Sequence, residues 1–432
     1  MAISNAGQAS LTFTNLPIGV QVTKITDTSA DWASVANSTY FYDKGDGLVH
    51  YKNSSGIVLE LFSAGGLTYF TEAQSTASPN ATVNVDSLTA VASTTNADFV
   101  IKPKGTGALI TDIPDGTGPG GAKRGTAALD LQLTRSFFSR VASGNYSIAI
   151  GRENTASGLD SLCIGANGNA TGQQSMIMGQ GTSSGTSSIA LGMSVTATNT
   201  YAASLGHLVN ASANQSMSLG HSSNATGDFS YALGREHTVS GTAAGAIGGQ
   251  ACTSSGSRSI IIGHSSIANG DYSFVMGRQA HSFGIYGRQV YAAGQVGVSG
   301  DAQKSLFIMR IRTTDIAATT ITTDGGGGGS TNQVILSNNS AYRFKGSIVG
   351  KQSGSVNAAV WDIDGFIVRG ANAAATTLNV SNVTLVQNTP AWGTPTLAAD
   401  TTNGGLRVQV TGAAATNIQW TATIDTTEVI YA

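Results

Sequence analysis

Two carboxylates in the C-terminal part of the sequence are close enough to act together in catalysis or in metal binding. Asp362 and Asp364 alternate along one expected strand, so both side chains lie on one face with Cα atoms about 6.7 Å apart. Paired carboxylates can cleave glycosidic bonds or contribute to a calcium site. Nothing in the surrounding sequence distinguishes an acid from a base, and calcium requires more oxygen ligands. A solvated strand face is therefore the preferred interpretation.

Basic side chains recur at one position of a sequence repeat that is described below. His207 and His221 lie 14 residues apart, which is one repeat length. Such a column could bind a pair of metal ions or hold anionic surface sugars. The simpler alternative is a solvated ladder of corner residues. The column contains Arg152, His207, His221, Arg235, His264 and Arg278.

The remaining candidates indicate little chemistry. Residues 325–329 are five glycines, but no Lys-Ser/Thr pair follows them, so they predict a flexible loop and no phosphate site. Cys163 and Cys252 lie six repeats apart, about 29 Å, too far for a disulfide within one chain. We expect Cys163 to be a buried, reduced side chain. No catalytic triad or cofactor motif stands out, so we predict no enzyme, no bound metal and no cofactor.

The composition of the chain restricts its class. Of 432 residues, 55 are glycine, about twice the usual share, and only 11% are charged, with a net charge of -2. This low charge excludes a basic nucleic-acid-binding surface, whereas 41% hydrophobic residues predict a folded chain. We expect neither a secretory signal nor a transmembrane helix. Excess Gly, Ser, Thr and Asn favours a turn-rich, all-β protein.

A 14-residue unit repeats ten times between residues 146 and 284. A second glycine follows the first by six to eight residues in eight units, and Asn199 and Ala213 replace it in the other two. Two five-residue strands and two tight turns make fourteen residues, so each unit predicts one coil of a flat, two-sided β-roll. Ten coils would form a rod roughly 48 Å long. The first glycine stands at positions 151, 165, 179, 192, 206, 220, 234, 248, 263 and 277.

Three columns of this unit predict how the roll packs. The residue before the first glycine is always large and apolar, and the residue two positions earlier shares its side of the strand. We expect this side to fill the interior. The large-residue side contains Ile148, Ile150, Ile164, Met178, Leu191, Leu205, Leu219, Leu233, Ile247, Ile262 and Met276. The middle column, which includes Ala149, Cys163, Ile177, Ile261 and Val275, points the opposite way.

The middle column decides the expected assembly. Because a soluble monomer rarely exposes a long apolar stripe, we expect partner chains to cover this column. Cyclic symmetry closes such a contact most simply, and a narrow roll suits three copies. The alternative is a solitary roll whose middle column is only mildly apolar.

The repeat also supports a family resemblance. Residues 147–151 (SIAIG) followed by 156–158 (ASG) resemble the head repeat of trimeric autotransporter adhesins, the YadA-like left-handed β-roll. This resemblance covers about a third of the chain and implies a trimer with an adhesive role. From the flanks we expect neither the secretion signal nor the membrane anchor of that family. The flanks instead resemble bacteriophage fibre proteins, on residues 96–107, 123–132, 300–303, 323–325 and 338–342.

The expected organisation has five parts. Residues 1–75 predict a small β module with a hairpin near residues 40–51 and a strand at 57–62, and the phage resemblance implies particle attachment there. Residues 76–145 predict an intertwined neck, 146–284 the roll, and 285–303 a connector. Residues 304–432 predict a β-sandwich of jelly-roll type. This sandwich would form a receptor-binding tip, with Trp392, Asp362 and Asp364 as candidate contacts.

These features predict an all-β, elongated homotrimeric tail fibre of a virion, assembled in the host cytoplasm. It would bind phage tail or baseplate proteins through its N-terminus and adhere to a host surface glycan or protein without bond chemistry. We expect no nucleic-acid partner and no membrane insertion. The alternatives are a capsid-mounted decoration fibre, a polysaccharide-degrading tailspike and a secreted bacterial adhesin.

Overall fold

The computed structural model describes residues 98–431, Asn96 and five short strands that precede them. The chain divides into two compact units, Met1–Lys102 and Pro103–Ala432. Apart from a short 3-10 helix, η2 (Ala373–Ala375), all regular structure in the described residues is β-strand. None of the helical structure described there is long and apolar enough to span a membrane.

The first unit contains two small antiparallel sheets. β1, β2 and β3 pair in chain order, and β4 pairs with β5. The predicted hairpin and the strand after it are confirmed by β1, β2 and β3, whereas the turn of this hairpin lies outside the described residues. The strands are β1 (Tyr40–Asp43), β2 (Val49–Lys52), β3 (Val58–Phe62), β4 (Phe70–Ser75) and β5 (Val85–Ala90).

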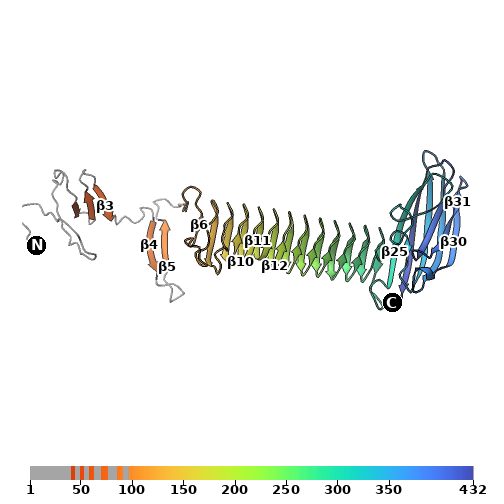
Figure 1. Cartoon of the computed structure of the whole chain (residues 1–432), viewed down its shortest axis with the longest axis horizontal. Helices are drawn as coiled ribbons and strands as arrows, with labels where there is room; N and C mark the ends of the chain where they lie inside the picture. Colours follow the sequence, from red (N-terminus) through yellow and green to blue (C-terminus); the bar gives the residue numbers. More distant parts are fainter. Residues whose placement is uncertain are drawn as a thin grey trace, which may run out of the picture. The chain divides into compact units, whose positions relative to one another are not determined.

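The second unit begins with a β-roll of stacked coils (Figure 1). Each coil has a first strand and a shorter second strand, and each strand pairs in parallel with its counterpart in the next coil. Ile148 pairs with Leu162, for example, and Leu162 with Met176. The first strands are β8 (Ile148–Arg152), β13 (Ala203–His207), β15 (Met217–His221), β17 (Tyr231–Arg235), β19 (Gly245–Gln250), β21 (Ile260–His264) and β23 (Phe274–Arg278).

The second strands complete the coils. In three coils the two strands are continuous: β10 (Leu162–Ala170), β11 (Met176–Ser183) and β12 (Ile189–Ala197). The separate second strands are β9 (Thr155–Ala156), β14 (Asn210–Ala211), β16 (Asn224–Ala225), β18 (Thr238–Val239), β20 (Thr253–Ser254) and β22 (Ile267–Ala268).

The stack extends beyond the ten predicted units at both ends. β6 (Leu109–Ile110) pairs with β7 (Leu129–Thr134), and β7 pairs with β8. At the other end, β24 (Gln289–Ala292) pairs in parallel with β23. Gln132 pairs with Gly151 and Ala292 pairs with Gly277, so each stands where the repeat has its first glycine. The end coils therefore lack the repeat signature, which is why the sequence assigned them to a neck and a connector.

The interior of the roll is lined by the middle column, and this corrects the predicted orientation. Ala149, Cys163 and Ile177 have no exposed surface, whereas Met178 and Leu219 on the large-residue side are 46% and 44% exposed. The second strands fill the same interior with Ala156, Ala170, Ala211, Ala225 and Val239. Small side chains therefore meet from both sides, and a large side chain in every coil would overpack the space. The large residues point outward.

Two glycine columns allow the coils to turn and to approach one another. At Gly220, φ is +123°, and an added Cβ would lie 2.0 Å from the Gly234 carbonyl oxygen. Gly158 needs no unusual φ, but its Cβ would lie 1.9 Å from the Gly172 oxygen. Both positions therefore exclude side chains for steric reasons.

A β-sandwich follows the roll, because β24 pairs antiparallel with β25. One sheet has the strand order β25-β33-β28-β29-β30; in the other, β32 pairs with β26, β27 and β31. The core between the sheets includes Trp361, Trp420, Phe307 and Phe344. The sandwich strands are β25 (Ala302–Thr313), β26 (Ala318–Thr320), β27 (Val334–Ile335), β28 (Ser340–Gln352), β29 (Ala358–Arg369), β30 (Thr376–Asn388), β31 (Gly393–Asp400), β32 (Gly405–Thr411) and β33 (Ile418–Ile430).

The strand order of the sandwich is simpler than that of a jelly roll. β28, β29 and β30 are consecutive neighbours in one sheet, and β33 returns to lie beside β28. This arrangement is a single Greek key, whereas a jelly roll contains two. The two-layer architecture agrees with the prediction, and the detailed strand order differs from a jelly roll.

Candidate functional site

The outward side of the first strands forms a continuous apolar surface, which we call the apolar face. It consists of the large-residue column before each first glycine and the column two residues earlier. In-register pairing stacks each column into a ladder, as in Ile150, Ile164 and Met178. Several members remain substantially exposed in the single chain: Met178, Ile189, Met217, Leu219, Ile247, Ile262 and Met276. The single chain therefore leaves much of the apolar face uncovered.

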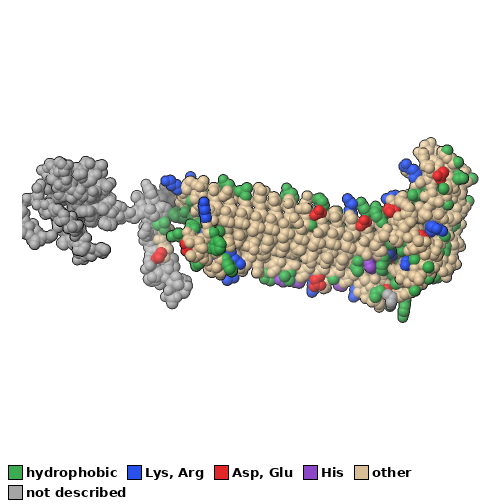
Figure 2. Space-filling view, viewed as in Figure 1, with side chains coloured by type: hydrophobic (Ala, Val, Ile, Leu, Met, Phe, Trp, Pro, Cys, Tyr) green, Lys and Arg blue, Asp and Glu red, His purple; other side chains and the backbone are tan. Residues whose placement is uncertain are grey.

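The opposite side of the roll has a different chemistry. The outward residues of the second strands and the adjoining turns are Ser, Thr and Asn in nearly every coil, such as Ser157, Asn169 and Thr238, all exposed. In Figure 2, the visible surface of the roll is mostly small polar side chains and backbone, and hydrophobic side chains gather at its edges. The polar side can remain in water, whereas the apolar face favours a protein partner.

The apolar face continues onto the sandwich. Gln289 and Tyr291 of β24 pair in register with Leu306 and Lys304 of β25, so the outward columns pass from the roll into the five-stranded sheet. A groove of about 190 Å³ at this point is lined by Phe274, Met276, Tyr291 and Leu306, among others. The Lys304–Asp425 ion pair at 2.8 Å marks the start of a more polar surface.

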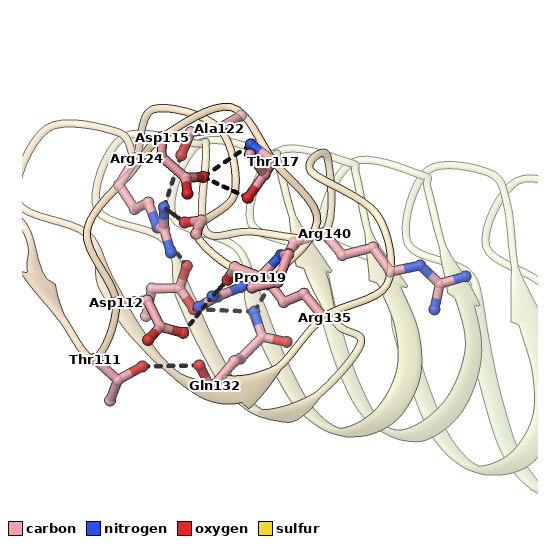
Figure 3. Close-up of polar contacts among 12 residues, drawn as sticks. Thr111, Asp112, Asp115, Thr117, Pro119, Ala122, Arg124, Gln132, Arg135 and Arg140 are labelled. Atoms are coloured by element: carbon pink, nitrogen blue, oxygen red, sulfur yellow. Dashed lines mark hydrogen bonds and ion pairs between the residues drawn. The ribbon is translucent and has the colours of Figure 1, made fainter.

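A buried polar cluster closes the N-terminal end of the roll (Figure 3). Asp130, which has no exposed surface, accepts hydrogen bonds from Arg124 Nε at 2.6 Å and from Arg135 Nη2 at 3.1 Å. Arg135 also donates to Asp112. Gln132 donates to Asp130, and its Oε1 accepts the Asn154 N–H at 2.6 Å. This cluster supplies hydrogen-bond partners that a preceding coil would otherwise provide.

We predict that Asp130→Ala destabilises the chain by about 3–5 kcal/mol, because it leaves two buried guanidinium groups without their shared carboxylate. Chemical denaturation followed by circular dichroism measures this change. Asp160→Asn, at an exposed turn residue of the roll with φ +56°, is the control and should change stability by no more than about 0.5 kcal/mol. Equal effects of the two substitutions would contradict the assigned role of Asp130.

A second buried cluster joins the last coil to the sandwich. Arg288 occupies the position in the coil that is serine in most units, and it is fully buried. Its guanidinium pairs with the buried Glu428 of β33 and donates to Ser305 Oγ. Gln303 also donates to Glu428. Burial opposes the charge of Arg288, but the Glu428 carboxylate more than compensates and raises the pKa of the guanidinium above its usual value.

His281 lies beside this cluster and predicts an acid-dependent loss of stability. Burial, together with the charge of Arg288, lowers the pKa of His281 to about 4. Between pH 6.5 and 4 the unfolded chain takes up a proton that the folded chain does not, so stability falls by at most about 3 kcal/mol as the pH falls through this range. Burial also lowers the pKa of His237, which acts in the same direction.

The His281→Phe variant tests this prediction. His281 packs on Phe283 with ring centroids 4.1 Å apart, and its buried Nε2 has no hydrogen-bond partner among the described residues. An apolar ring should therefore be accepted and should flatten the stability profile between pH 6.5 and 4. The profile is measured by urea unfolding at successive pH values. An unchanged slope in the variant would contradict the role of His281.

The predicted basic column lies along one edge of the apolar face. Arg152, His221, Arg235 and Arg278 are exposed, and the rings of His207 and His221 lie 5.1 Å apart. Arg235 pairs with Glu236 at 3.0 Å, so the column is not uniformly positive. In the part of the chain that the structure describes, no three His, Cys, Asp or Glu side chains gather as a metal site.

The structure separates the predicted receptor contacts. Trp392 is only 7% exposed and packs edge-on against Trp420 in the core, with ring centroids 5.5 Å apart. A large aromatic ring gains more from burial between the sheets than from exposure, so its assignment as a surface contact is corrected. Asp362 is exposed on β29, and Asp364 pairs with Arg343 at 2.9 Å. These carboxylates lie on an outward, charged surface of the five-stranded sheet.

The other predicted features occupy structural positions. Cys163 and Cys252 are free and buried, and burial raises the pKa of the Cys163 thiol to about 12. Next to the five-glycine segment, Asp324 accepts hydrogen bonds from the Gly326 N–H and the Asn332 amide. Sequence reasoning missed both buried clusters. The signal that could have located them is a charged residue in a coil that departs from the repeat, as at Asp130 and Arg288.

Comparison with known proteins supports the roll. The YadA head domain repeat family model matches residues 142–167, 211–236 and 254–280. No curated protein matches the chain. Among solved structures, the tailspike protein gp49 from Acinetobacter baumannii bacteriophage Fri1, a capsular polysaccharide depolymerase, is similar, with 9% identity and a TM-score of 0.21. The match covers 74% of this chain and 56% of that one, so the chain spans little more than half of the tailspike. The chain thus contains a YadA-like β-roll.

This comparison corrects one prediction. The expectation that the protein is not an enzyme is contradicted by similarity to a polysaccharide depolymerase. A TM-score of 0.21 assigns no reaction, substrate or catalytic residue to this chain. Incubation of the purified protein with host capsular polysaccharide is therefore needed to measure whether it cleaves the polymer.

Proposed function

We propose that the chain is the subunit of a homotrimeric bacteriophage fibre or spike that adheres to the surface of a host cell. The observation that carries the proposal is the one-sided exposure of the large apolar ladders, with Met178, Leu219 and Ile262 each more than 40% exposed. Covering the exposed part of one such side chain contributes about 1 kcal/mol. The free energy gained by covering two ladders over ten coils therefore exceeds an association cost of roughly 4–15 kcal/mol.

Parallel packing around a threefold axis would cover the apolar face and leave the Ser, Thr and Asn side in water. Such a cyclic arrangement closes without free interfaces. The number three follows from the resemblance to trimeric adhesin heads. The bacteriophage assignment rests on the resemblance of the flanking segments to phage fibre proteins. On this proposal the trimer assembles in the host cytoplasm and becomes part of the virion.

The two ends of the chain would have different roles. The N-terminal unit would bind phage tail or baseplate proteins, and the sandwich would contact a host glycan or protein. Three sandwiches on one rod bind together, so weak single contacts add to strong adhesion. Loops of the sandwich would determine the receptor.

Electron microscopy of virions carrying a gold label at residue 432 tests this arrangement. We expect label at the free ends of tail fibres, and labelled purified protein should bind host cells. Label on the capsid surface, or absence of binding to host cells, would contradict the proposal. The same purified protein is incubated with host capsular polysaccharide. Released reducing ends would identify a depolymerising spike in place of a purely adhesive fibre.

A further inference from the structure

Exposed aromatic side chains mark the turn that leads into the outward strand. Their exposed fractions are between 46% and 60%. All four have φ between +57° and +59°, a left-handed conformation that is costly for a bulky side chain and cheaper for Gly or Asn. The same turn position is left-handed in other coils, as at Asp160, Gln174 and Ala243, so the conformation belongs to the turn and the exposed aromatic side chain is what distinguishes these four coils. The residues are Tyr146, Tyr201, Phe229 and Tyr272.

Each of these aromatic residues is followed six positions later by a basic residue at the other end of the same strand. The basic residues are Arg152, His207, Arg235 and Arg278. In the ten units, every aromatic turn residue is followed six positions later by a basic residue. The two remaining basic residues, His221 and His264, follow Gln215 and Arg258 by six positions. The two edges of the apolar face therefore carry complementary side chains in the same coils.

The paired residues cannot meet within one chain. Six residues of extended strand separate them by roughly 20 Å, and the apolar face lies between them. Within the described structure the edges have separate neighbours: His207 stacks on His221, and Tyr272 contacts Arg258, with Tyr Oη 3.0 Å from Arg Nη1. Contacts within the single chain therefore do not explain why the aromatic and basic residues occur in the same coils.

We propose that neighbouring copies of this chain meet edge to edge, so that each aromatic side chain stacks on the basic side chain of the same coil in the next copy. This inference rests on the cyclic trimer proposed above. Three strands that surround an axis in the same sense bring the end of one strand to the start of the next. Rotation without translation keeps each coil at the same level. An aromatic ring and a cation then form cation–π contacts that fix the axial register of the three rolls.

Cysteine cross-linking tests this register. The Tyr201→Cys/His207→Cys variant carries one thiol at each edge of one coil. We expect a short bismaleimide to link three chains covalently, visible on a denaturing gel. The control, Tyr201→Cys/Arg235→Cys, displaces one thiol by two coils, about 9.6 Å, and should link far less. The native Cys163 and Cys252 have no exposed surface, so the unmodified protein is the blank.

The outcomes separate this inference from the proposed function. A trimeric mass with equal cross-linking of the two variants would overturn the edge contact and leave the fibre proposal intact. A single-chain mass for the unmodified protein would overturn both.

A double-mutant cycle provides a second measurement. Tyr146→Ala and Arg152→Ala should each raise the concentration of half-dissociation about tenfold or more, because three contacts are lost per trimer, and the double variant should add little to either. Fully additive effects would overturn the contact.

Discussion

Replacing Met178 with aspartate should convert the assembly into single chains of 43.8 kDa while leaving the roll folded. Met178 stands in an exposed ladder, paired in register with Ile164 and Leu191. In a single chain, a carboxylate there remains in water. In the proposed trimer, three carboxylates would be removed from water near the axis, at a cost of several kcal/mol each. Light scattering measures the mass, and circular dichroism measures the strand content.

Ser184→Asp is the matched control for this variant. Ser184 is exposed on the polar side of the same coil. The charge is the same, but the proposed trimer leaves this side in water, so its mass should stay unchanged. If Met178→Asp remained fully associated at micromolar concentration, the apolar face would not be the interface. If both variants dissociated, the effect would be one of charge alone.

Glu428→Ala should destabilise the second unit by about 3–5 kcal/mol, with a fall in melting temperature of roughly 5 °C. The reason is that Arg288 is fully buried and loses the carboxylate that pairs with it. Because this pair connects the last coil to the C-terminal strand, we expect the roll and sandwich to lose stability together. Differential scanning calorimetry measures the transition.

Two further variants make this prediction specific. Asp364→Asn removes the Arg343–Asp364 pair, which is 39–52% exposed, and should cost no more than about 1 kcal/mol. Arg288→Leu/Glu428→Leu replaces both buried charges with apolar groups and should recover most of the stability lost by Glu428→Ala. If Glu428→Ala unfolded at the temperature of the unmodified chain, the buried pair would have no stabilising role.

The repeat made most of the roll predictable. A period of fourteen, the two glycine columns and the alternation of side chains were sufficient to predict coils and their register. They did not determine which side faces inward. The prediction placed the largest residues inside, as at Ile150, whereas the structure buries Ala149. The narrow space between two facing strands selects small side chains, and hydrophobicity alone does not measure that width.

The ends of the roll were harder to predict for a different reason. Asp130 meets Arg124 and Arg135 through loop positions that no periodic pattern relates. Arg288 and Glu428 are 140 residues apart, so only the folded chain brings them together. In the sandwich, alternation predicted many of the strands, but strand order depends on long connections. The sequence likewise did not indicate that Trp392 packs against Trp420 in the core, because their contact depends on the folded sandwich.

The mass of the purified, unmodified chain in solution is the most direct measurement of the central claim. Multi-angle light scattering at micromolar concentration should give about 131 kDa, which is three times the 43.8 kDa of one chain. A stable, soluble species of 43.8 kDa would show that one chain can leave its large apolar ladders in water, and would contradict the proposed fibre.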